Sequence, residues 1–395
     1  MTAAVPGPAF LFAFLMVATC LRAAITAVGP LLGTLQVDMG LSATTAGVLA
    51  SLPLLLFAAC APLARLARNH GSERLLVAAL CVLVLGILLR SQGHVAALFG
   101  GTLLLAGAIA VANILLPALV KQHFPTRIPM VTTAYATVLG VSASLGSGLS
   151  VPLAGWLGGW QASLASWALP AVLVVLLWAP QVRHAAPLQS QAEGPPPAMP
   201  WRSGLAWQVT GYMGLQSLAF YMTASWYPAM LGDLGWSADA SGWYLSLYMI
   251  AAMLAGLAVP WLVRRSVGQQ GLGAATGLLT ALGVGGLMIQ PQWLGLWMVL
   301  MGIGTGPAFV LALSFMGLRA ADARTAAALS LMAQSLGYLL AAAGPVCFGW
   351  LHDVTGGWTG SMAFALLMAL AMAACGYGAG RVGRSVTAQA VGRRA

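Results

Sequence analysis

The chain has 395 residues, of which 60% are hydrophobic and only 6% are charged, and its mean hydropathy is +0.89. Soluble domains carry about 25% charged residues, so this composition excludes a soluble globular protein and indicates a helical membrane protein along its whole length. The net charge of +10 would suggest a nucleic-acid partner in a soluble protein, but here the basic residues follow a membrane-topology pattern. We therefore expect the lipid bilayer as a partner and no nucleic acid.

Twelve apolar segments of membrane-spanning length can be counted. They lie near residues 9–35, 44–64, 75–91, 95–120, 130–154, 160–180, 204–230, 240–262, 271–289, 292–318, 326–350 and 359–379. The longest polar break is 181–203, whose Glu, Gly and Pro residues are typical of a linker. The sequence predicts an all-α membrane protein of twelve transmembrane helices, with six-helix bundles at 1–180 and 204–380, a cytoplasmic linker at 181–203 and a cytoplasmic tail at 381–395.

The two halves of the sequence resemble each other at three places. Gly40-Leu-Ser42 recurs as Gly235-Trp-Ser237, Pro152-Leu-Ala-Gly recurs around Pro345, and Trp160-Gln-Ala-Ser163 recurs as Trp358-Thr-Gly-Ser361. A repeat of half the chain predicts two pseudo-symmetric bundles in parallel orientation, with a substrate site at the midplane between them, as in transporters.

Fifteen of the seventeen Lys and Arg residues lie in the loops after even-numbered segments or in the C-terminal tail. The exceptions are Arg90, on the opposite side, and Arg22, inside the first segment. By the positive-inside rule both termini are expected in the cytoplasm, and we expect the bacterial inner membrane as the location.

Arg22 lies near the middle of the first apolar segment, a few residues before Gly29-Pro30. An arginine stays charged, and placing it at mid-membrane costs about 2.5–3.5 kcal/mol on insertion scales. Gly29-Pro30 is expected to interrupt the helix beside a cavity. Intramembrane charges usually serve function, which favours a substrate anion as the counterpart of Arg22; the alternative is a structural arginine bonded to carbonyls of a neighbouring helix.

The acidic and histidine side chains all lie in loops or at segment ends. The sequence therefore predicts no acidic partner for Arg22 at mid-membrane, and a proton relay through a buried carboxylate lacks its usual residue. Coupling through the substrate's own proton remains an alternative.

A few other polar residues are expected at membrane depth. They are Asn113 in the fourth segment, Gln216 in the seventh, four residues before Phe220 and so on the same helix face, and Gln334 and Tyr338, spaced alike in the eleventh. Each could hydrogen-bond a small substrate, or could instead join helices, which contributes about 0.6 kcal/mol in a membrane bundle.

Two small-residue patterns are expected to pack helices closely. Gly140, Ser144 and Gly148 have small-xxx-small spacing, and Gly302-Ile-Gly304-Thr-Gly306-Pro307 resembles part of a dinucleotide loop but lies inside an apolar segment. The five cysteines also fall in apolar segments. Neither an ATP-binding motif nor a hydrolase motif is present, so we expect no enzyme activity, no cofactor and no metal.

Four segments carry a resemblance to a known family. They are Leu21-Arg22-Ala-Ala-Ile-Thr26-Ala-Val-Gly29-Pro30, Asn113-Ile-Leu-Leu-Pro117-Ala-Leu-Val-Lys121, the stretch from Gln216 through Tyr221 to Trp226-Tyr-Pro228, and Met332-Ala-Gln334-Ser-Leu-Gly337-Tyr338. In these the chain resembles the major facilitator superfamily, and within it the cyanate permease and 2-nitroimidazole exporter family. The loop after the second segment departs from the superfamily pattern, with Arg65 where an Asp is usual.

The resemblance implies that the first, fourth, seventh and tenth segments line a central cavity. We expect a monomeric secondary carrier of a small organic or inorganic anion, working by alternating access, with Arg22 binding the negative charge. The expected substrate-binding residues are Arg22, Thr26, Asn113, Gln216, Phe220, Tyr221, Trp226, Gln334 and Tyr338. Alternatives are an exporter of neutral or drug-like compounds such as nitroimidazoles and, from other classes, an intramembrane enzyme or a receptor.

Overall fold

A computed structural model of the chain describes residues 8–59, 71–180, 199–266, 268–381 and 385–386. The described part is almost wholly helical, and each predicted segment coincides with one helix or with short helices in succession. The elements are α1 Pro8–Thr26, η1 Gly29–Leu31, α2 Leu32–Met39, α3 Ala43–Ala58, α5 Ser72–Arg90, α6 Val95–His123, α7 Ile128–Leu157, α8 Trp160–Ser166, α9 Ala168–Trp178, α10 Gly204–Asp233, α11 Ala238–Leu257, α12 Val259–Arg265, α13 Gln270–Ile289, η3 Pro291–Trp293, α14 Leu294–Leu318, α15 Ala323–Thr355 and α16 Trp358–Ala379.

Within the described residues, ten helical stretches are long and apolar enough to cross a membrane, and α3 is a shorter apolar helix. The remaining predicted segment is α10, whose 30 residues include several polar and glycine positions. A bilayer offers the backbone no water, so its N–H and C=O groups must pair within each segment, and a helix does this locally. The twelve-helix membrane architecture predicted from the sequence is confirmed.

The chain divides into two compact units. The first holds residues 1–191 together with Ala224–Met249, and the second holds Ala192–Thr223 together with Ile250–Ala395. The later part of α10 and the first part of α11 therefore belong to the first unit. The predicted division into bundles at 1–180 and 204–380 stays a prediction.

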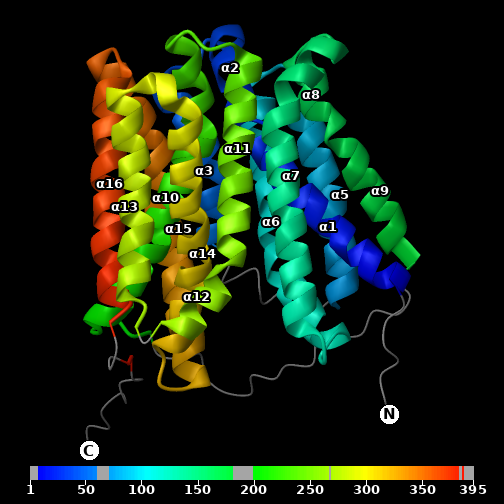
Figure 1. Ribbon diagram of the computed structural model, residues 1–395. Helices are drawn as coiled ribbons and strands as arrows, with labels where there is room; N and C mark the ends of the chain where they lie inside the picture. Colours follow the sequence, from blue (N-terminus) through cyan, green and yellow to red (C-terminus); the bar gives the residue numbers. More distant parts are fainter. Residues whose placement is uncertain (1–7, 60–70, 181–198, 267, 382–384, 387–395) are drawn as a thin grey trace, which may run out of the picture. The chain divides into compact units, whose positions relative to one another are not determined.

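In the first unit, α1 packs along α7 and also contacts α9, while α5 packs along α6. Figure 1 shows these helices side by side, with α1 and α2 in blue. A buried apolar cluster lies where α1 gives way to α2, and it includes Leu31, Leu35, Leu52 and Trp160. This cluster fixes the short segments that follow the interruption of α1.

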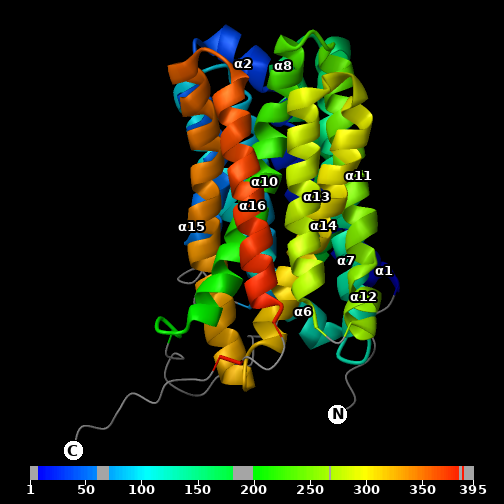
Figure 2. The same cartoon turned by 60° about the vertical axis from the view of Figure 1, so that its left-hand side comes forward.

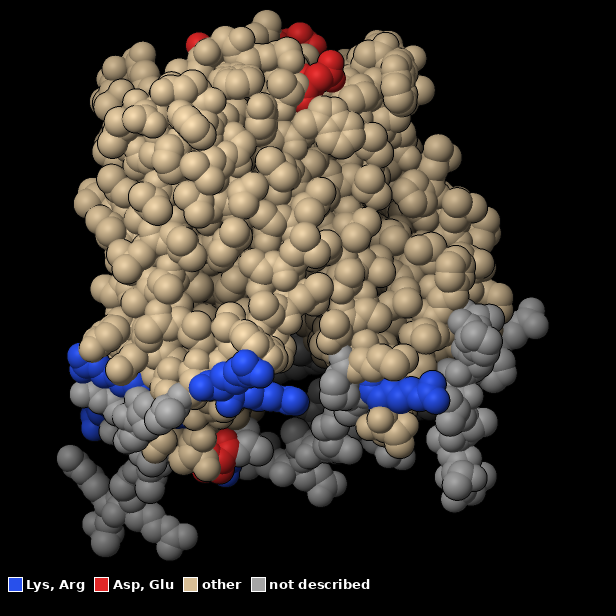
Figure 3. Space-filling view, viewed as in Figure 1, with Lys and Arg blue, Asp and Glu red and all other residues tan. Residues whose placement is uncertain are grey.

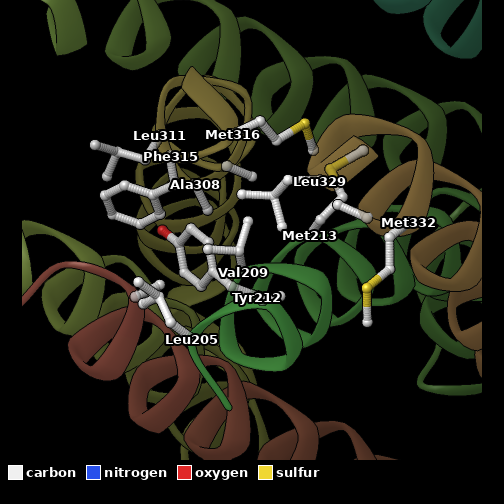
Figure 4. Close-up of a cluster of buried hydrophobic side chains, with 14 of the residues drawn as sticks. Leu205, Val209, Tyr212, Met213, Ala308, Leu311, Phe315, Met316, Leu329 and Met332 are labelled. Carbon is white, nitrogen blue, oxygen red and sulfur yellow. The ribbon is translucent and has the colours of Figure 1, made fainter. Parts of the chain in front are cut away.

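In the second unit, α13 packs against both α14 and α16, and α15 contacts α14 and α16 (Figure 2). Its core is drawn in Figure 4, where Tyr212 and Met213 from α10 meet Phe315 of α14 and Met332 of α15. The rings of Tyr212 and Phe315 are 5.6 Å apart. The Tyr212 hydroxyl is 2.7 Å from the Thr276 hydroxyl of α13, so this buried polar group is paired.

The internal repeat has a local structural basis. The Ser163 hydroxyl donates to the carbonyl of Ser150 at 2.6 Å, and its repeat counterpart Ser361 donates to the carbonyl of Phe348 at 2.7 Å. Both bonds reach back thirteen residues across the turn between consecutive helices. The two halves therefore use the same side-chain bond at the same turn.

A second repeated feature starts α3 and α11. Gly40 and Gly235 both have positive φ, 62° and 94°, a conformation that glycine adopts without strain. Two residues later, Ser42 accepts a hydrogen bond from the Thr45 N–H, and Ser237 accepts one from the Ala240 N–H. Serine at this position caps a helix N-terminus, so the sequence repeat marks equivalent helix starts.

Charged side chains lie mostly at the ends of the helices. Figure 3 shows the middle of the helices almost without charged side chains. Arg264 and Arg265, for example, form the last turn of α12. Arg22 lies within α1 instead, four residues before its end.

Candidate functional site

The first transmembrane segment is interrupted where the sequence predicts it. α1 ends at Thr26, a turn of 3₁₀ helix covers Gly29–Leu31, and α2 continues from Leu32. Pro30 has no N–H and cannot continue the α-helical ladder. A Cβ atom on Gly29 would lie 1.9 Å from the carbonyl oxygen of Ala224 in α10. Only glycine fits at that point, because the backbone of α10 runs directly against the interruption.

Arg22 lies in α1, four residues before the helix ends at Thr26, and its side chain is partly exposed. Arg22 also takes part in an interaction within the protein, so it is not the unpartnered charge that the sequence suggested. What the structure supports is a permanent charge, partly accessible, beside a helix interruption.

α7 holds the turn of α1 that carries Arg22. The Ser142 hydroxyl accepts the N–H of Ala23 at 3.2 Å and donates to the carbonyl of Thr19, two groups that pair with each other in an uninterrupted helix. The Thr26 hydroxyl donates to the carbonyl of Ala143 at 2.9 Å. Thr26 is only 3% exposed, so its hydroxyl joins α1 to α7; its assignment to the substrate site stays a prediction.

The other two predicted residues of the first unit differ in exposure. Asn113 is exposed in the middle of α6, one turn before Pro117. Trp226 is fully buried in α10, in the part of that helix that packs with the first unit. Asn113 is therefore accessible from outside the protein, whereas Trp226 is packed in the interior; the assignment of both to the substrate site stays a prediction.

The predicted residues of the second unit form two groups, on α10 and on α15. Gln216 is 2% exposed and its Nε2 donates to the Ser217 hydroxyl at 2.6 Å. The ring of Phe220 is partly exposed and meets the ring of Tyr221 edge-on at 5.2 Å.

On α15, Gln334 is exposed and donates to the Ser330 hydroxyl at 2.9 Å, and Tyr338 is partly exposed. α10 and α15 approach closely, since a Cβ atom on Gly214 would lie 2.9 Å from the carbonyl oxygen of Gly337. Phe220, Gln334 and Tyr338 are thus the members of this set that are at least partly exposed, and their assignment to the substrate site stays a prediction.

Arg90 is a residue that the sequence reasoning missed. It ends α5, is fully buried, and its Nη1 donates to the carbonyl of Ala24 in α1 at 2.6 Å. The sequence did hold a signal for Arg90. It is the one basic residue on the side predicted to be non-cytoplasmic, where the positive-inside rule predicts few basic residues. Arg90 contacts α1 two residues after Arg22.

A cavity of about 870 Å³ opens in the first unit, lined by α2, the end of α7, the start of α8 and the start of α11. None of the predicted substrate residues lines it. Its ionisable lining groups are Asp38, which accepts the Trp160 indole N–H at 2.9 Å, and Asp239. Two carboxylates repel an anion, so this cavity does not suit the ligand that Arg22 would bind.

Among the described residues, no group of three or more His, Cys, Asp or Glu side chains is placed to hold a metal ion. The loop with Arg65, where the superfamily pattern is altered, lies outside the described residues.

Comparison with known proteins identifies the family. The model of the Major Facilitator Superfamily matches residues 14–345. The chain is 42% identical to the 2-nitroimidazole transporter of Escherichia coli (strain K12) over 371 residues, 93% of this chain and 94% of that protein. It is 28% identical to the cyanate transport protein CynX of the same organism over 357 residues, 90% of this chain and 92% of that protein.

A solved structure shares the fold. A bacterial homologue of the human lysosomal transporter Spinster, crystallised in an inward-facing, unoccupied conformation, aligns with a TM-score of 0.77 at 15% sequence identity, covering 95% of this chain and 97% of that one. At this identity the likeness concerns the fold alone. Together with the helical architecture and the family match, it leads to one conclusion: the chain is a multi-pass membrane transporter of the major facilitator superfamily, in the family of the 2-nitroimidazole and cyanate transport proteins.

Proposed function

We propose that this transporter is a secondary carrier of a small organic or inorganic anion, cyanate-like or carboxylate-like, and that it works by alternating access. The observation that carries the proposal is Arg22: a permanent charge, partly exposed, in a membrane-spanning helix and one turn before that helix is interrupted. Ionisable residues in such positions usually line substrate paths. Arg22 would bind the negative charge.

The names of the relatives support an anion. Cyanate is a small anion, and the E. coli relative that the chain matches at 28% identity is named for it. The nitro group of 2-nitroimidazole makes its ring N–H acidic, so the substrate named for the other relative can also lose a proton to become a small planar anion. Both substrates can then share one guanidinium, whose planar fork suits planar anions.

We assign hydrogen-bonding roles to Asn113, Gln334 and Tyr338 and apolar contacts to Phe220, on the basis of their exposure. Thr26, Gln216, Tyr221 and Trp226 are buried and would contribute only after a conformational change. We also propose that the protein is a monomer in the bacterial inner membrane. Both termini are proposed to lie in the cytoplasm, because the basic residues gather in the loops of one side.

The test is uptake by proteoliposomes of [¹⁴C]cyanate, comparing wild type with Arg22→Lys and Arg22→Gln. A hydrogen bond to a charged group contributes about 1.5–3 kcal/mol, so we expect Arg22→Gln to reduce the apparent affinity by about tenfold or more. Arg74→Gln is the matched control, because Arg74 is exposed in the first turn of α5. Equal cyanate uptake by wild type and Arg22→Gln refutes the role of Arg22.

A second candidate function is export of neutral, drug-like compounds, which the 42% identity to a 2-nitroimidazole transporter favours. Two probes separate it from anion transport. 2-Nitroimidazole can ionise, whereas 1-methyl-2-nitroimidazole has no ring N–H to lose. The anion carrier moves only the first of them and depends on Arg22, while an exporter of neutral compounds moves both and is indifferent to Arg22→Gln.

A further inference from the structure

The inference concerns Arg90, the last residue of the membrane-spanning helix α5 in the first unit. Its side chain is 0% exposed and its Nη1 is 2.6 Å from the carbonyl oxygen of Ala24, yet its Nε and Nη2 atoms have no hydrogen-bond partner among the described residues. A buried charge with unsatisfied donors is costly. A Cβ atom on Gly101 would lie 2.3 Å from the Arg90 backbone nitrogen, so α6 fixes the place from which this side chain extends.

The carbonyl that Arg90 contacts has lost its usual partner. In a continuous helix the N–H of Val28 would donate to the oxygen of Ala24. Here it points to the oxygen of Ile25 at 3.4 Å, because the chain tightens into the 3₁₀ turn around Pro30. The carbonyl end of α1 therefore holds an acceptor that the helix itself does not pair, and Arg90 supplies the missing donor.

The same geometry raises an electrostatic problem for an anion. The C-terminal end of a helix carries the equivalent of roughly half a negative charge, and Arg22 lies only four residues before the end of α1. In transporters with interrupted helices, such carbonyl ends commonly coordinate a coupling cation. In this chain the guanidinium of Arg90 already occupies a position of that kind against α1.

We propose that Arg90 is a positioning residue for the interrupted helix α1. Its guanidinium pairs the carbonyl end of α1 and cancels the negative field there. The turn that carries Arg22 can then receive an anion. The inference rests on the proposed anion transport and deepens it. Arg90 is buried behind α1 and does not touch the substrate; it acts through Ala24 and through its charge.

Three substitutions separate charge from hydrogen bonding. Arg90→Lys keeps the charge and a donor, Arg90→Gln keeps a donor without charge, and Arg90→Met keeps neither. Cyanate is the probe, its Kd measured on purified protein in lipid nanodiscs, with thermal melting of each variant recorded beside it. We expect Arg90→Lys to stay within about threefold of wild type and both neutral variants to bind cyanate about tenfold more weakly, the size of a charge acting at a partly buried helix end.

Arg319→Gln is the matched control. Arg319 is also a largely buried arginine that closes a helix end, since its Nε donates to the carbonyl of Ala379 at 2.7 Å and its Nη2 to that of Gly380 at 3.0 Å. It serves α16 instead of α1. We expect Arg319→Gln to lower the melting temperature and to leave the cyanate Kd unchanged.

The outcomes divide clearly. If Arg90→Gln binds cyanate as wild type does while Arg90→Met does not, Arg90 is only a hydrogen-bonding cap and the charge argument is overturned. If Arg90→Lys is as weak as Arg90→Met, or if all three variants bind like wild type, the inference is also overturned. Failure of wild type to bind any anionic probe refutes the anion carrier itself, whereas binding that needs Arg22 but ignores Arg90 overturns this inference alone.

Discussion

The contact between α1 and α7 can be tested at a single glycine. A Cβ atom on Gly146 would lie 2.5 Å from the hydroxyl oxygen of Thr26 and 2.8 Å from both the Cα and the carbonyl oxygen of Ala23. Two of those atoms are backbone atoms of the turn that carries Arg22, so they cannot turn aside. Gly155 of the same helix offers a matched site, because a Cβ atom there would meet nothing within 4 Å.

The size of the effect follows from these distances. Ordinary van der Waals contact starts near 3.4 Å, so Gly146→Ala must push α1 away by about 0.6 Å. Overpacking of this kind costs about 1–3 kcal/mol, whereas alanine in place of helical glycine contributes up to about 1 kcal/mol of stabilisation at either position. We expect Gly146→Ala to be less stable than Gly155→Ala by about 1–3 kcal/mol.

The assay is thermal unfolding of the purified variants in the same detergent, followed by light scattering and by tryptophan fluorescence. We expect Gly146→Ala to melt about 1–4 °C below Gly155→Ala. Its cyanate affinity should also fall, since the displaced turn carries Arg22. A Gly146→Ala protein that melts with Gly155→Ala and binds cyanate normally would show that α1 does not lie this close to α7, and the reasoning about the site would fail with it.

Two further predictions concern side-chain hydrogen bonds at helix starts. Ser163→Ala and Ser361→Ala should each lower stability by about 0.6 kcal/mol, and by similar amounts, because each removes a repeat-equivalent bond; melting curves that differ widely between them would contradict the equivalence. The Thr325 N–H, which donates to Asp322 at 2.7 Å, holds the pKa of that carboxyl below its usual value, so its contribution to stability is present at neutral pH and is lost as the pH falls through the lowered pKa. Asp322→Ala should lose the cap of α15 at neutral pH and Asp322→Asn should largely keep it, as measured by melting between pH 3 and pH 7; Asp322→Ala as stable as wild type would argue against the cap.

The small residues of α7 show that a sequence pattern can predict close helix packing without identifying the partner helix. The spacing of Gly140, Ser144 and Gly148 predicted close helix packing, and the structure confirms it for Ser144, whose carbonyl accepts the Ser246 hydroxyl at 2.7 Å, and for Gly148, where a Cβ atom would lie 2.6 Å from that hydroxyl. These contacts go to α11. The contact with α1 uses Ser142 and Gly146 instead, and the sequence did not single these out, because spacing identifies a small face but not its partner.

The sequence by itself determined the membrane helices, the interruption at Gly29-Pro30 and the repeat. Each of these depends on local physics: apolar segments of sufficient length must form helices in a bilayer, proline breaks the ladder where it stands, and serine and glycine mark helix ends. Only the tertiary structure decided that Thr26 bonds to α7, that Gln216 is buried, and that Arg90 donates to a carbonyl at the end of α1. Those outcomes depend on which helices meet, and helix contacts join residues 66 to 123 positions apart along the chain, a separation at which periodicity and composition carry no information.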